Sequence, residues 1–596
     1  MSARRTQSQR SQWRLRVTML VIIFIVTVFG TRLMQLQGLD PQAYAAKAAA
    51  SGVVSVPLPA KRGQILDRTG KALADSIDGR MLIADPLATK PYAGAIAGVL
   101  SKELGLDYFD VLAKLSKPNS RYQYLARRVP STQADAAIAA VKATVKALIQ
   151  DPKRKAMPFG GVYSQPDVLR TYPTKDVASN IVGFLKDDGT PAAGLELAFN
   201  SRLAGHDGAE TYEVGSGHRI PLGENSTKAP VDGEDLRLTI DSDLNWYAAR
   251  VLRTAVQSSG SESGSVVVMN SKTGEVLALA DYPSFDGNNP GKTKAADLGS
   301  RAISDVYEPG SVEKVLTVSA LLDQKLVTPR TKLKVPPTLP VQDRVIHDWF
   351  PHDTIRLTLA GVIARSSNIG TAMAASQMPA HQLHDYLSAF GLGQRTNIGL
   401  GGESRGILPD YRSWQPVNEA TIAFGQGVSV NAVQMAAAVN TIANKGEYVS
   451  PSLIQGTATT ASGDKVGTDT STRHRVISPA AADQMSRMME MVPNPVTGTA
   501  PKAQVTGYRV AGKTGTAQRV GAHCGCYDGT FTVSFAGFAP ADDPAFTVYV
   551  VVQNPRNGGG GGSIGGPAFS KIMRYLLSRY AVAPTNTKPA HLPIQW

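Results

Sequence analysis

The sequence predicts a mixed α/β fold of the α+β type: an antiparallel sheet flanked by helices, preceded by a separate N-terminal domain and one transmembrane helix. An uncharged apolar run near the start of the chain predicts the transmembrane helix. Late extended segments rich in β-branched residues predict the sheet, and apolar periodicity between them predicts the helices. With 596 residues, of which 42% are hydrophobic, the chain is long enough for two or three domains with cores.

The first element is the apolar segment 17–36, which is long enough to cross a bilayer as a helix if Arg32 extends to the interface. Residues 1–16 contain five arginines and no acidic residue, which predicts a cytoplasmic tail and an extracytoplasmic body. A cleaved signal peptide is the alternative, but Thr31-Arg32-Leu33 does not match an Ala-x-Ala cleavage site. We therefore expect an uncleaved single-pass anchor in the cytoplasmic membrane.

The formal net charge of +14 predicts attraction to polyanions. Nucleic acid is excluded as the expected partner, because no zinc-finger spacing, RNA-binding aromatic signature or further basic helix follows the N-terminal tail. The two cysteines, Cys524 and Cys526, cannot support a disulfide framework, and no ligand-type residues cluster as in a structural metal site. The pair could form a local disulfide, sense redox state or be incidental, and these alternatives stay open.

A non-catalytic domain is predicted after the anchor. Residues 37–222 mix short extended segments with helices such as 133–149, and they contain no repeat and no nucleophile with its base. Glycine, proline and charged residues concentrate at 223–235, which predicts a linker. Residues 236–582 are expected to form the second domain, followed by a C-terminal tail at 583–596.

The second domain is predicted to combine early and late strands in one sheet, with helices packed on both faces. The expected strands are 236–240, 265–270, 275–280, 509–518, 530–538 and 545–553. The expected helices are 243–258, several stretches up to about residue 445, and 567–580. The glycine-rich segment 557–566 predicts a mobile loop before the last helix.

Ser311 and Lys314 form a Ser-x-x-Lys motif at the predicted start of a helix. In the first turn, unpaired amides and the helix dipole favour a developing negative charge, and residues three apart share one face. A lysine amine that is desolvated enough to lose its proton could act as the base for a serine nucleophile. Alone the motif is weak, because Ser462 and Lys465 repeat it in a polar loop and Ser311 could be an ordinary helix N-cap.

Two further motifs follow. Ser366-Ser367-Asn368 falls at a predicted helix-to-loop junction, where the first hydroxyl could pass a proton and the amide could hold a substrate backbone. Lys513-Thr514-Gly515-Thr516 falls in a predicted strand, where the ammonium and hydroxyl groups could bind a carboxylate and the glycine permits close approach of the backbone.

Each of these motifs also occurs by chance elsewhere in the chain. Ser429-Val430-Asn431 fits the second pattern, and Lys272-Thr273-Gly274 fits the third, but the latter precedes Ser311 in a predicted tight turn. Order and context separate the two sets. Serine-lysine at a helix start, then serine-asparagine, then lysine-threonine-glycine on a late strand together favour an active site.

In this order, the three motifs resemble those of the penicilloyl serine transferases. Residues 307–314, YEPGSVEK, with Arg301 upstream, resemble class B penicillin-binding proteins in particular. Residues 62–74, which begin RGQILDR, and residues 170–196, which contain RTYP, Gly183 and GLE, resemble the non-catalytic pedestal of that class. The resemblance spans nearly the whole chain, and its layout is closest to the division-specific FtsI type, of an actinobacterial kind.

The resemblance implies a penicillin-binding/transpeptidase fold on an elongated pedestal, and a serine-type D,D-transpeptidase that cross-links peptidoglycan peptide stems in septal wall synthesis. Ser311 would form an acyl-enzyme with the stem or with a β-lactam, and its amide would form an oxyanion hole with that of Thr516. No metal or organic cofactor is implied. The implied catalytic residues are Ser311, Lys314, Ser366, Asn368 and Lys513, and the implied substrate-binding residues are Thr514, Gly515 and Thr516.

Membrane partners are also implied: a SEDS-type glycosyltransferase of the FtsW kind and other divisome proteins, docked on the anchor and on residues 40–222. The alternatives are an elongation-type transpeptidase, a D,D-carboxypeptidase, a β-lactam-binding sensor, a silent scaffold and a serine β-lactamase. The last would be less than half as long and would need a hydrolytic base, which we do not identify. Glu313 departs from the uncharged residue common at its position, and we expect it to point away from Ser311.

Overall fold

The structure is a computed structural model that describes residues 5–35, 53–150, 159–215, 218–219, 225–521 and 525–596. Two compact units are distinguished and are described separately. One consists of Met1–Ala60 and His206–Val231, and the other of Lys61–Gly205 and Asp232–Trp596. Of the two cysteines, Cys524 lies outside the described residues, as does Leu36 at the end of the predicted anchor.

The first unit contains the N-terminal helix and a small antiparallel sheet. Helix α1 (Arg5–Met34) contains a stretch, Trp13–Met34, that is long and apolar enough to cross a membrane. This finding is compatible with the predicted single-pass anchor. In the sheet, β6 (Gly208–Gly215) pairs with β1 (Val53–Leu58), β7 (His218–Arg219) and β8 (Ser226–Lys228). Strand β8 falls within the stretch that the sequence predicts to be a linker.

The second unit begins with a subdomain that has its own small core. Its sheet is built on β3 (Ala72–Ala84), which pairs with β2 (Ile65–Leu66), β4 (Gln123–Pro130) and β5 (Val162–Thr171). Three helices pack together beside it: α4 (Ala93–Leu104), α5 (Tyr108–Leu115) and α6 (Ser131–Leu148). The buried face of α6 repeats every three or four residues, as an amphipathic helix requires: Ala134, Ala137, Ile138, Val141 and Val145.

A buried ion triad joins three distant segments of this subdomain. The Glu196 carboxylate, fully buried, accepts from Arg62 Nε at 2.5 Å and from Arg170 Nε at 2.7 Å. Arg62 also donates to Asn200 Oδ1 at 2.7 Å, and Arg170 donates to the carbonyl of Gly63 at 2.9 Å. The stretches that resemble the class B pedestal in sequence therefore meet around one carboxylate.

We predict that Glu196→Ala strongly destabilises this subdomain. Two nearly buried guanidinium groups would lose their counter-charge, which typically costs about 3–5 kcal/mol. Thermal and denaturant unfolding of the full chain in detergent measure the effect. Glu234→Ala is the matched control, because Glu234 pairs with Arg202 at the surface with 74% of its side chain exposed and such pairs contribute about 1 kcal/mol or less. Equal losses in the two variants would contradict the prediction.

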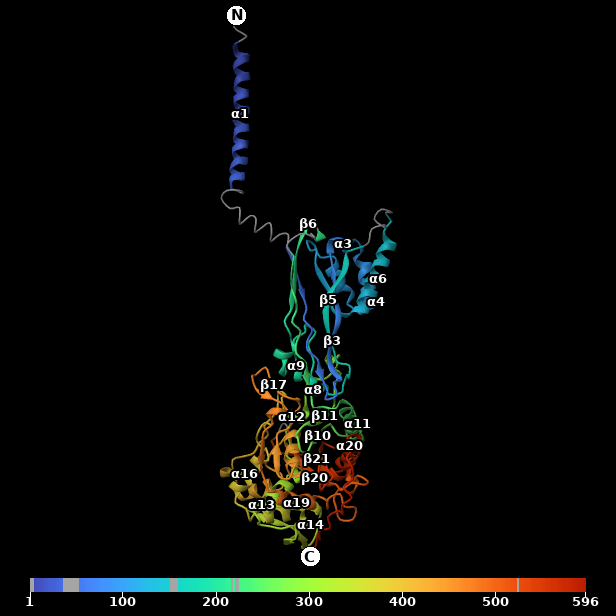
Figure 1. The fold of residues 1–596 in the computed structure, drawn as a ribbon, viewed down its shortest axis with the longest axis vertical. Helices are drawn as coiled ribbons and strands as arrows, with labels where there is room; N and C mark the ends of the chain where they lie inside the picture. Colours follow the sequence, from blue (N-terminus) through green and yellow to red (C-terminus); the bar gives the residue numbers. More distant parts are fainter. Residues whose placement is uncertain (1–4, 36–52, 151–158, 216–217, 220–224, 522–524) are drawn as a thin grey trace. The chain divides into compact units, whose positions relative to one another are not determined.

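The main sheet has five antiparallel strands in the order β11-β10-β22-β21-β20. Figure 1 shows strands from the middle of the chain, β10 and β11, in the same sheet as the late strands β21 and β20. The strands are β10 (Ser263–Asn270), β11 (Val276–Tyr282), β20 (Ala511–Val520), β21 (Tyr527–Ala539) and β22 (Phe546–Gln553). The paired strands β10 and β22 are rich in valine and buried, as is typical of strands that are covered on both faces. The predicted α+β class is thereby confirmed.

Helices cover both faces of this sheet. On β22, Phe546 contacts Tyr580, which follows α20, whereas its neighbour Thr547 donates to Asn440 of α18 at 2.7 Å. Because successive side chains of a strand point to opposite faces, α20 and α18 lie on opposite sides. Helix α11 packs against α20. The bounds are α11 (Ser242–Ser258), α18 (Ala432–Ala443), α19 (Pro479–Met489) and α20 (Gly566–Arg579).

The middle of the chain is less helical than the sequence predicts. Two small antiparallel strand pairs interrupt it, β12 (Lys332–Val335) with β15 (Ile355–Thr358) and, between them in the sequence, β13 (Leu339–Val341) with β14 (Arg344–Ile346). The helices that carry or surround the site are α13 (Lys314–Asp323), α14 (Leu359–Arg365), α15 (Asn368–Ala375), α16 (Ala380–Ala389) and α17 (Pro416–Ile422). The predicted glycine loop contains a π-helical turn, Gly561–Gly565.

Candidate active site

Ser311 lies in a 3-10 turn, Gly310–Val312, that leads directly into α13. The sequence predicts a helix start here, and the structure confirms it, with the regular α-helix beginning three residues later at Lys314. The N-cap positions of the two helices are Pro309 and Glu313, and neither makes a side-chain cap bond. The interpretation of Ser311 as an ordinary N-cap is therefore wrong. Its side chain is half-buried and makes no hydrogen bond to the described residues.

Close glycine contacts hold this turn against strand β20. A Cβ added to Gly515 would lie 2.9 Å from Val312 Cγ2 and 3.1 Å from the carbonyl oxygen of Pro309. On the other side, a Cβ on Gly310, whose φ is +54°, would lie 2.9 Å from the carbonyl oxygen of Thr516. Any side chain at these positions would push the serine away from the strand, so both glycines are needed to bring the two motifs together.

The second motif joins α14 to α15. Ser366 ends α14 in the left-handed region, with φ at +61°, and Ser367 caps α15 by accepting from Gly370 N at 2.9 Å. This sharp turn brings both Ser366 and Asn368 to Lys314. Lys314 Nζ donates to the Ser366 carbonyl and to Asn368 Oδ1, each at 2.7 Å, and lies 3.5 Å from Ser366 Oγ.

The third motif reaches the same turn from the sheet. Lys513 Nζ donates to Ser366 Oγ at 2.8 Å and to the carbonyl oxygen of Thr514 at 3.0 Å. Thr514 Oγ1 lies 3.2 Å from Thr499 Oγ1, and the exposed Thr516 hydroxyl donates to the Gly515 carbonyl at 2.9 Å. The Ser366 hydroxyl thus lies between two lysine amines from different elements. All three predicted motifs converge at one place in the fold.

Burial governs the electrostatics of the two lysines, which are both fully buried. Loss of solvation lowers the pKa of Lys314 to about 7, against smaller opposing effects of Asp348 and Glu313. Burial, together with the neighbouring charge of Lys314, lowers the pKa of Lys513 well below its ordinary value. The pair therefore favours neutral amines near pH 7, which differs from the permanent cation that the sequence suggests for Lys513.

Glu313, the unusual residue of the first motif, is buried at the N-cap position of α13. One of its oxygens accepts from Thr317 Oγ1 at 2.6 Å, and the other has no partner among the described residues. Burial raises the pKa of this carboxyl well above its ordinary value, which favours the neutral acid. Its bond one turn along α13 accords with the expectation that it points away from Ser311.

The chance copies of the motifs lie elsewhere and have structural roles. Ser462 bonds to Asp464 in the exposed turn between the short strands β17 (Ala458–Thr459) and β18 (Lys465–Val466). The Lys272-Thr273-Gly274 copy forms the tight turn between β10 and β11. Asn431 caps α18 by accepting from Gln434 N. The three motifs that meet around Lys314 are therefore those that the helix start, the helix-to-loop junction and the late strand indicate.

One residue that the sequence reasoning missed supports the second motif. Asp348, in the loop after β14, accepts from Ser367 Oγ at 2.6 Å and from the amide of Ile369 at 3.0 Å. Asn368 Nδ2 donates to the carbonyl of His347 at 2.9 Å. No motif marks these residues, and only their contacts with the Ser366–Asn368 turn reveal them.

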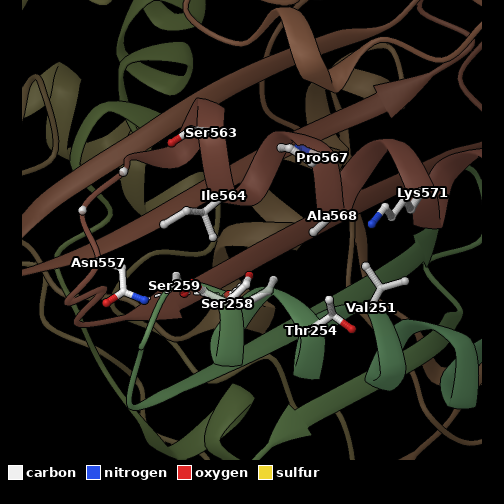
Figure 2. Close-up of a pocket in the computed structure, with 13 residues that line it drawn as sticks. Val251, Thr254, Ser258, Ser259, Asn557, Ser563, Ile564, Pro567, Ala568 and Lys571 are labelled. Atoms are coloured by element: carbon white, nitrogen blue, oxygen red, sulfur yellow. Dashed lines mark hydrogen bonds between the residues drawn. The ribbon is translucent and has the colours of Figure 1, made fainter.

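A cavity of about 310 Å³ lies behind the glycine-rich segment that borders the site. Figure 2 shows Ser258 and Ser259 of the α11 end on one side and Ser563, Ile564 and Lys571 on the other. A Cβ on Gly561 of that segment would lie 3.0 Å from Gly515 N. The segment therefore lines this cavity and also contacts strand β20.

The fold and the convergent motifs agree with two family matches. The family described as penicillin binding protein transpeptidase domain matches residues 264–574, and the family described as penicillin-binding protein dimerisation domain matches residues 57–238. The chain belongs to the class B penicillin-binding proteins. This confirms the resemblance that the motifs suggest.

Known relatives of this penicillin-binding protein cover nearly its full length. Penicillin-binding protein PbpB of Mycolicibacterium smegmatis is 35% identical over 97% of this chain and 92% of its own. Peptidoglycan D,D-transpeptidase FtsI of Escherichia coli is 31% identical over 96% of this chain and 92% of its own. The crystal structure of penicillin binding protein 3 from Mycobacterium tuberculosis, complexed with aztreonam, matches with a TM-score of 0.68 and 29% identity, covering 91% of this chain and all of that one.

Proposed function

We propose that this penicillin-binding protein is a serine-type peptidoglycan D,D-transpeptidase of septal wall synthesis, with Ser311 as its nucleophile. Relatives over the full chain are named peptidoglycan D,D-transpeptidases, including FtsI. The observation that carries the proposal is the placement of Ser366 Oγ between Lys314 Nζ and Lys513 Nζ. The same site would accept β-lactams, as the mycobacterial relative complexed with aztreonam does.

Lys314 is suited to be the base in acylation. A neutral amine has two hydrogens and one lone pair. The carbonyl of Ser366 and Oδ1 of Asn368 use both hydrogens, so the lone pair remains to take the proton of Ser311. Ser311 Oγ then attacks the carbonyl of the penultimate D-alanine, and the amides of Ser311 and Thr516 stabilise the oxyanion.

The Ser366 hydroxyl provides the route by which the proton leaves. It lies 3.5 Å from Lys314 Nζ and 2.8 Å from Lys513 Nζ. A proton taken from Ser311 can therefore pass to the amine of the departing D-alanine without entering bulk solvent. An amine from a second stem then attacks the ester and the path runs in reverse. None of these steps assigns a role to a metal or cofactor.

Strand β20 is suited to bind the donor stem, because it forms one edge of the main sheet. An extended peptide can add to such an edge through backbone hydrogen bonds. The hydroxyls of Thr514 and Thr516 would hold the terminal carboxylate, whose charge would also favour the protonated form of Lys513. Beyond Thr516, a cavity of about 550 Å³ lined by Glu308, Gln518 and Arg519 offers room for the rest of the stem.

The acylation rate should depend on pH with one main inflection near neutrality. Because burial lowers the pKa of Lys314 to about 7, the amine is protonated and inactive below that pH and free to act as base above it. We expect the second-order rate of acylation by a fluorescent penicillin to rise about tenfold per pH unit below 7 and then level off. A flat profile between pH 5 and 8 would contradict this role for Lys314.

Product analysis distinguishes the proposal from its alternatives. With a pentapeptide stem and a separate acceptor amine, we expect release of D-alanine together with a cross-linked dimer. Release of D-alanine without a dimer would indicate a D,D-carboxypeptidase. Rapid turnover of a labelled penicillin would indicate a β-lactamase, whereas a long-lived adduct agrees with a transpeptidase.

We also propose that α1 anchors the protein with its N-terminus in the cytoplasm and the catalytic domain outside, because arginines precede the apolar stretch and acidic residues do not. A SEDS-type glycosyltransferase of the FtsW kind and other divisome proteins are the proposed membrane partners. Replacing the anchor by an unrelated transmembrane helix should weaken co-purification with the glycosyltransferase. Full retention would count against docking through the anchor.

A further inference from the structure

Asp348 lies directly beneath the Ser366–Asn368 turn. Its side chain is fully buried, and both oxygens are used. Oδ1 accepts the amide hydrogen of Ile369 at 3.0 Å, and Oδ2 accepts from Ser367 Oγ at 2.6 Å. The two donors belong to the residues on either side of Asn368. One carboxylate therefore holds the first turn of α15, on which the Asn368 side chain is mounted.

His352 holds Asp348 from the other side. Its ring is nearly buried, with Nε2 3.2 Å from Asp348 Oδ2 and Nδ1 2.5 Å from the carbonyl oxygen of Asp353. Both partner atoms accept hydrogen bonds, and a neutral imidazole has one N–H, so the neutral ring can donate to one of them at a time. The ring is therefore a further contact of the Asp348 carboxylate, beside Ser367 and Ile369.

The carboxylate also acts electrostatically on Lys314. The described groups around Lys314 come from four elements: Ser366 ending α14, Asn368 on α15, Asp348 in the loop, and Lys513 on β20, which shares the Ser366 hydroxyl. On its own helix, Glu313 is buried and favours the neutral acid. Asp348 therefore supplies negative charge to the surroundings of Lys314, and this charge opposes the effect of burial on that amine.

We propose that Asp348, in contact with His352, is a positioning residue that holds Asn368 against Lys314 and supplies a counter-charge for Lys314. The inference rests on the proposed function, because it assumes that Lys314 is the base for Ser311. It makes two separable claims. The hydrogen bonds set the geometry of the site, and the charge sets the pH at which the base becomes available.

Asp348→Asn separates these claims, because asparagine keeps an acceptor for the amide of Ile369 but carries no charge. Without the charge, Lys314 should lose its proton more easily and be a weaker base. We expect the acid limb of the penicillin acylation profile to move roughly one pH unit lower and the plateau rate to fall about tenfold. Ser367→Ala keeps the charge but removes both the hydrogen bond to Asp348 and the N-cap bond from Gly370, so its plateau rate should fall while the acid limb stays in place.

Asp343→Asn is the matched charge control, because Asp343 lies in the same stretch with 78% of its side chain exposed. This variant should change neither the position of the acid limb nor the plateau rate of the penicillin acylation profile. A limb in Asp348→Asn that stays in place or moves to higher pH would overturn the charge claim. If that variant does not fold, Asp348→Glu keeps the charge and displaces the oxygens, so a wild-type plateau there would overturn the geometric claim. Labelling of Ser311→Ala would instead refute the proposed function.

Discussion

Replacing Ser311 by alanine should abolish covalent labelling by benzylpenicillin. Intact mass spectrometry of the wild-type chain is expected to show one penicilloyl adduct, and the variant none. The serine oxygen forms the ester, and removal of such a nucleophile typically lowers the rate by about 10⁶-fold. The fold should survive, because the Ser311 side chain makes no hydrogen bond to the described residues. An unchanged melting temperature would show that the loss is chemical.

Ser462→Ala is the matched control for this experiment. Ser462 belongs to the second Ser-x-x-Lys in the chain but lies in an exposed turn, bonded to Asp464. It should be labelled at the wild-type rate. A stoichiometric adduct on Ser311→Ala would show that another residue is the nucleophile, and peptide mapping would then locate it. Loss of labelling in both variants would indicate a general effect on the protein.

The strands of the main sheet could be predicted from local patterns, and the convergence of the motifs from their order, which resembles that of a known family. The runs of valine in β10 and β22 predict buried strands without any knowledge of their neighbours in the fold. The capping residue Asp241, which accepts from Asp243 N and Leu244 N, fixes the start of α11 to within one residue of the prediction. The motif order then indicated which of two similar copies belonged to the site.

The supporting contacts could not be predicted, because they join residues far apart in the sequence. Glu196 meets arginines 134 and 26 positions away, and nothing in its own segment shows that it is buried. Asp348 likewise lies in the loop between strands β14 and β15, in a stretch that the sequence led us to expect as helix. Short strands such as β13 and β14 bury too few residues to leave a clear periodic pattern.

The protonation of the lysines also depends on three-dimensional surroundings. A lysine in a sequence motif is expected to be a cation, but desolvation in a site shared by two amines lowers the pKa of both. Burial therefore favours the neutral amines that the proposed base and proton relay require. This change matters for any test that replaces one of the two residues.

Lys314→Gln should lower the acylation rate roughly 10³-fold, the middle of the range for a lost general base. The glutamine amide can still donate to the Ser366 carbonyl or to Asn368, so part of the hydrogen bonding that holds the second motif is kept. An amide cannot take the proton of Ser311 near neutral pH. The inflection near pH 7 in the penicillin acylation profile should therefore disappear together with the rate.

Two outcomes of this experiment would point to different errors. If Lys314→Gln is slow but keeps the inflection, another group sets the pH dependence, and Lys513, 2.8 Å from Ser366 Oγ, would be the first to test. If it acylates at the wild-type rate, Lys314 is a structural residue and the assignment of the base is wrong. Lys465→Gln, in the exposed copy of the motif, should change neither rate nor profile. Loss of both the acylation rate and the inflection near pH 7 would show that the Lys314 amine is the base. If Lys314 only filled space in the site, the glutamine variant would keep the rate, the inflection or both.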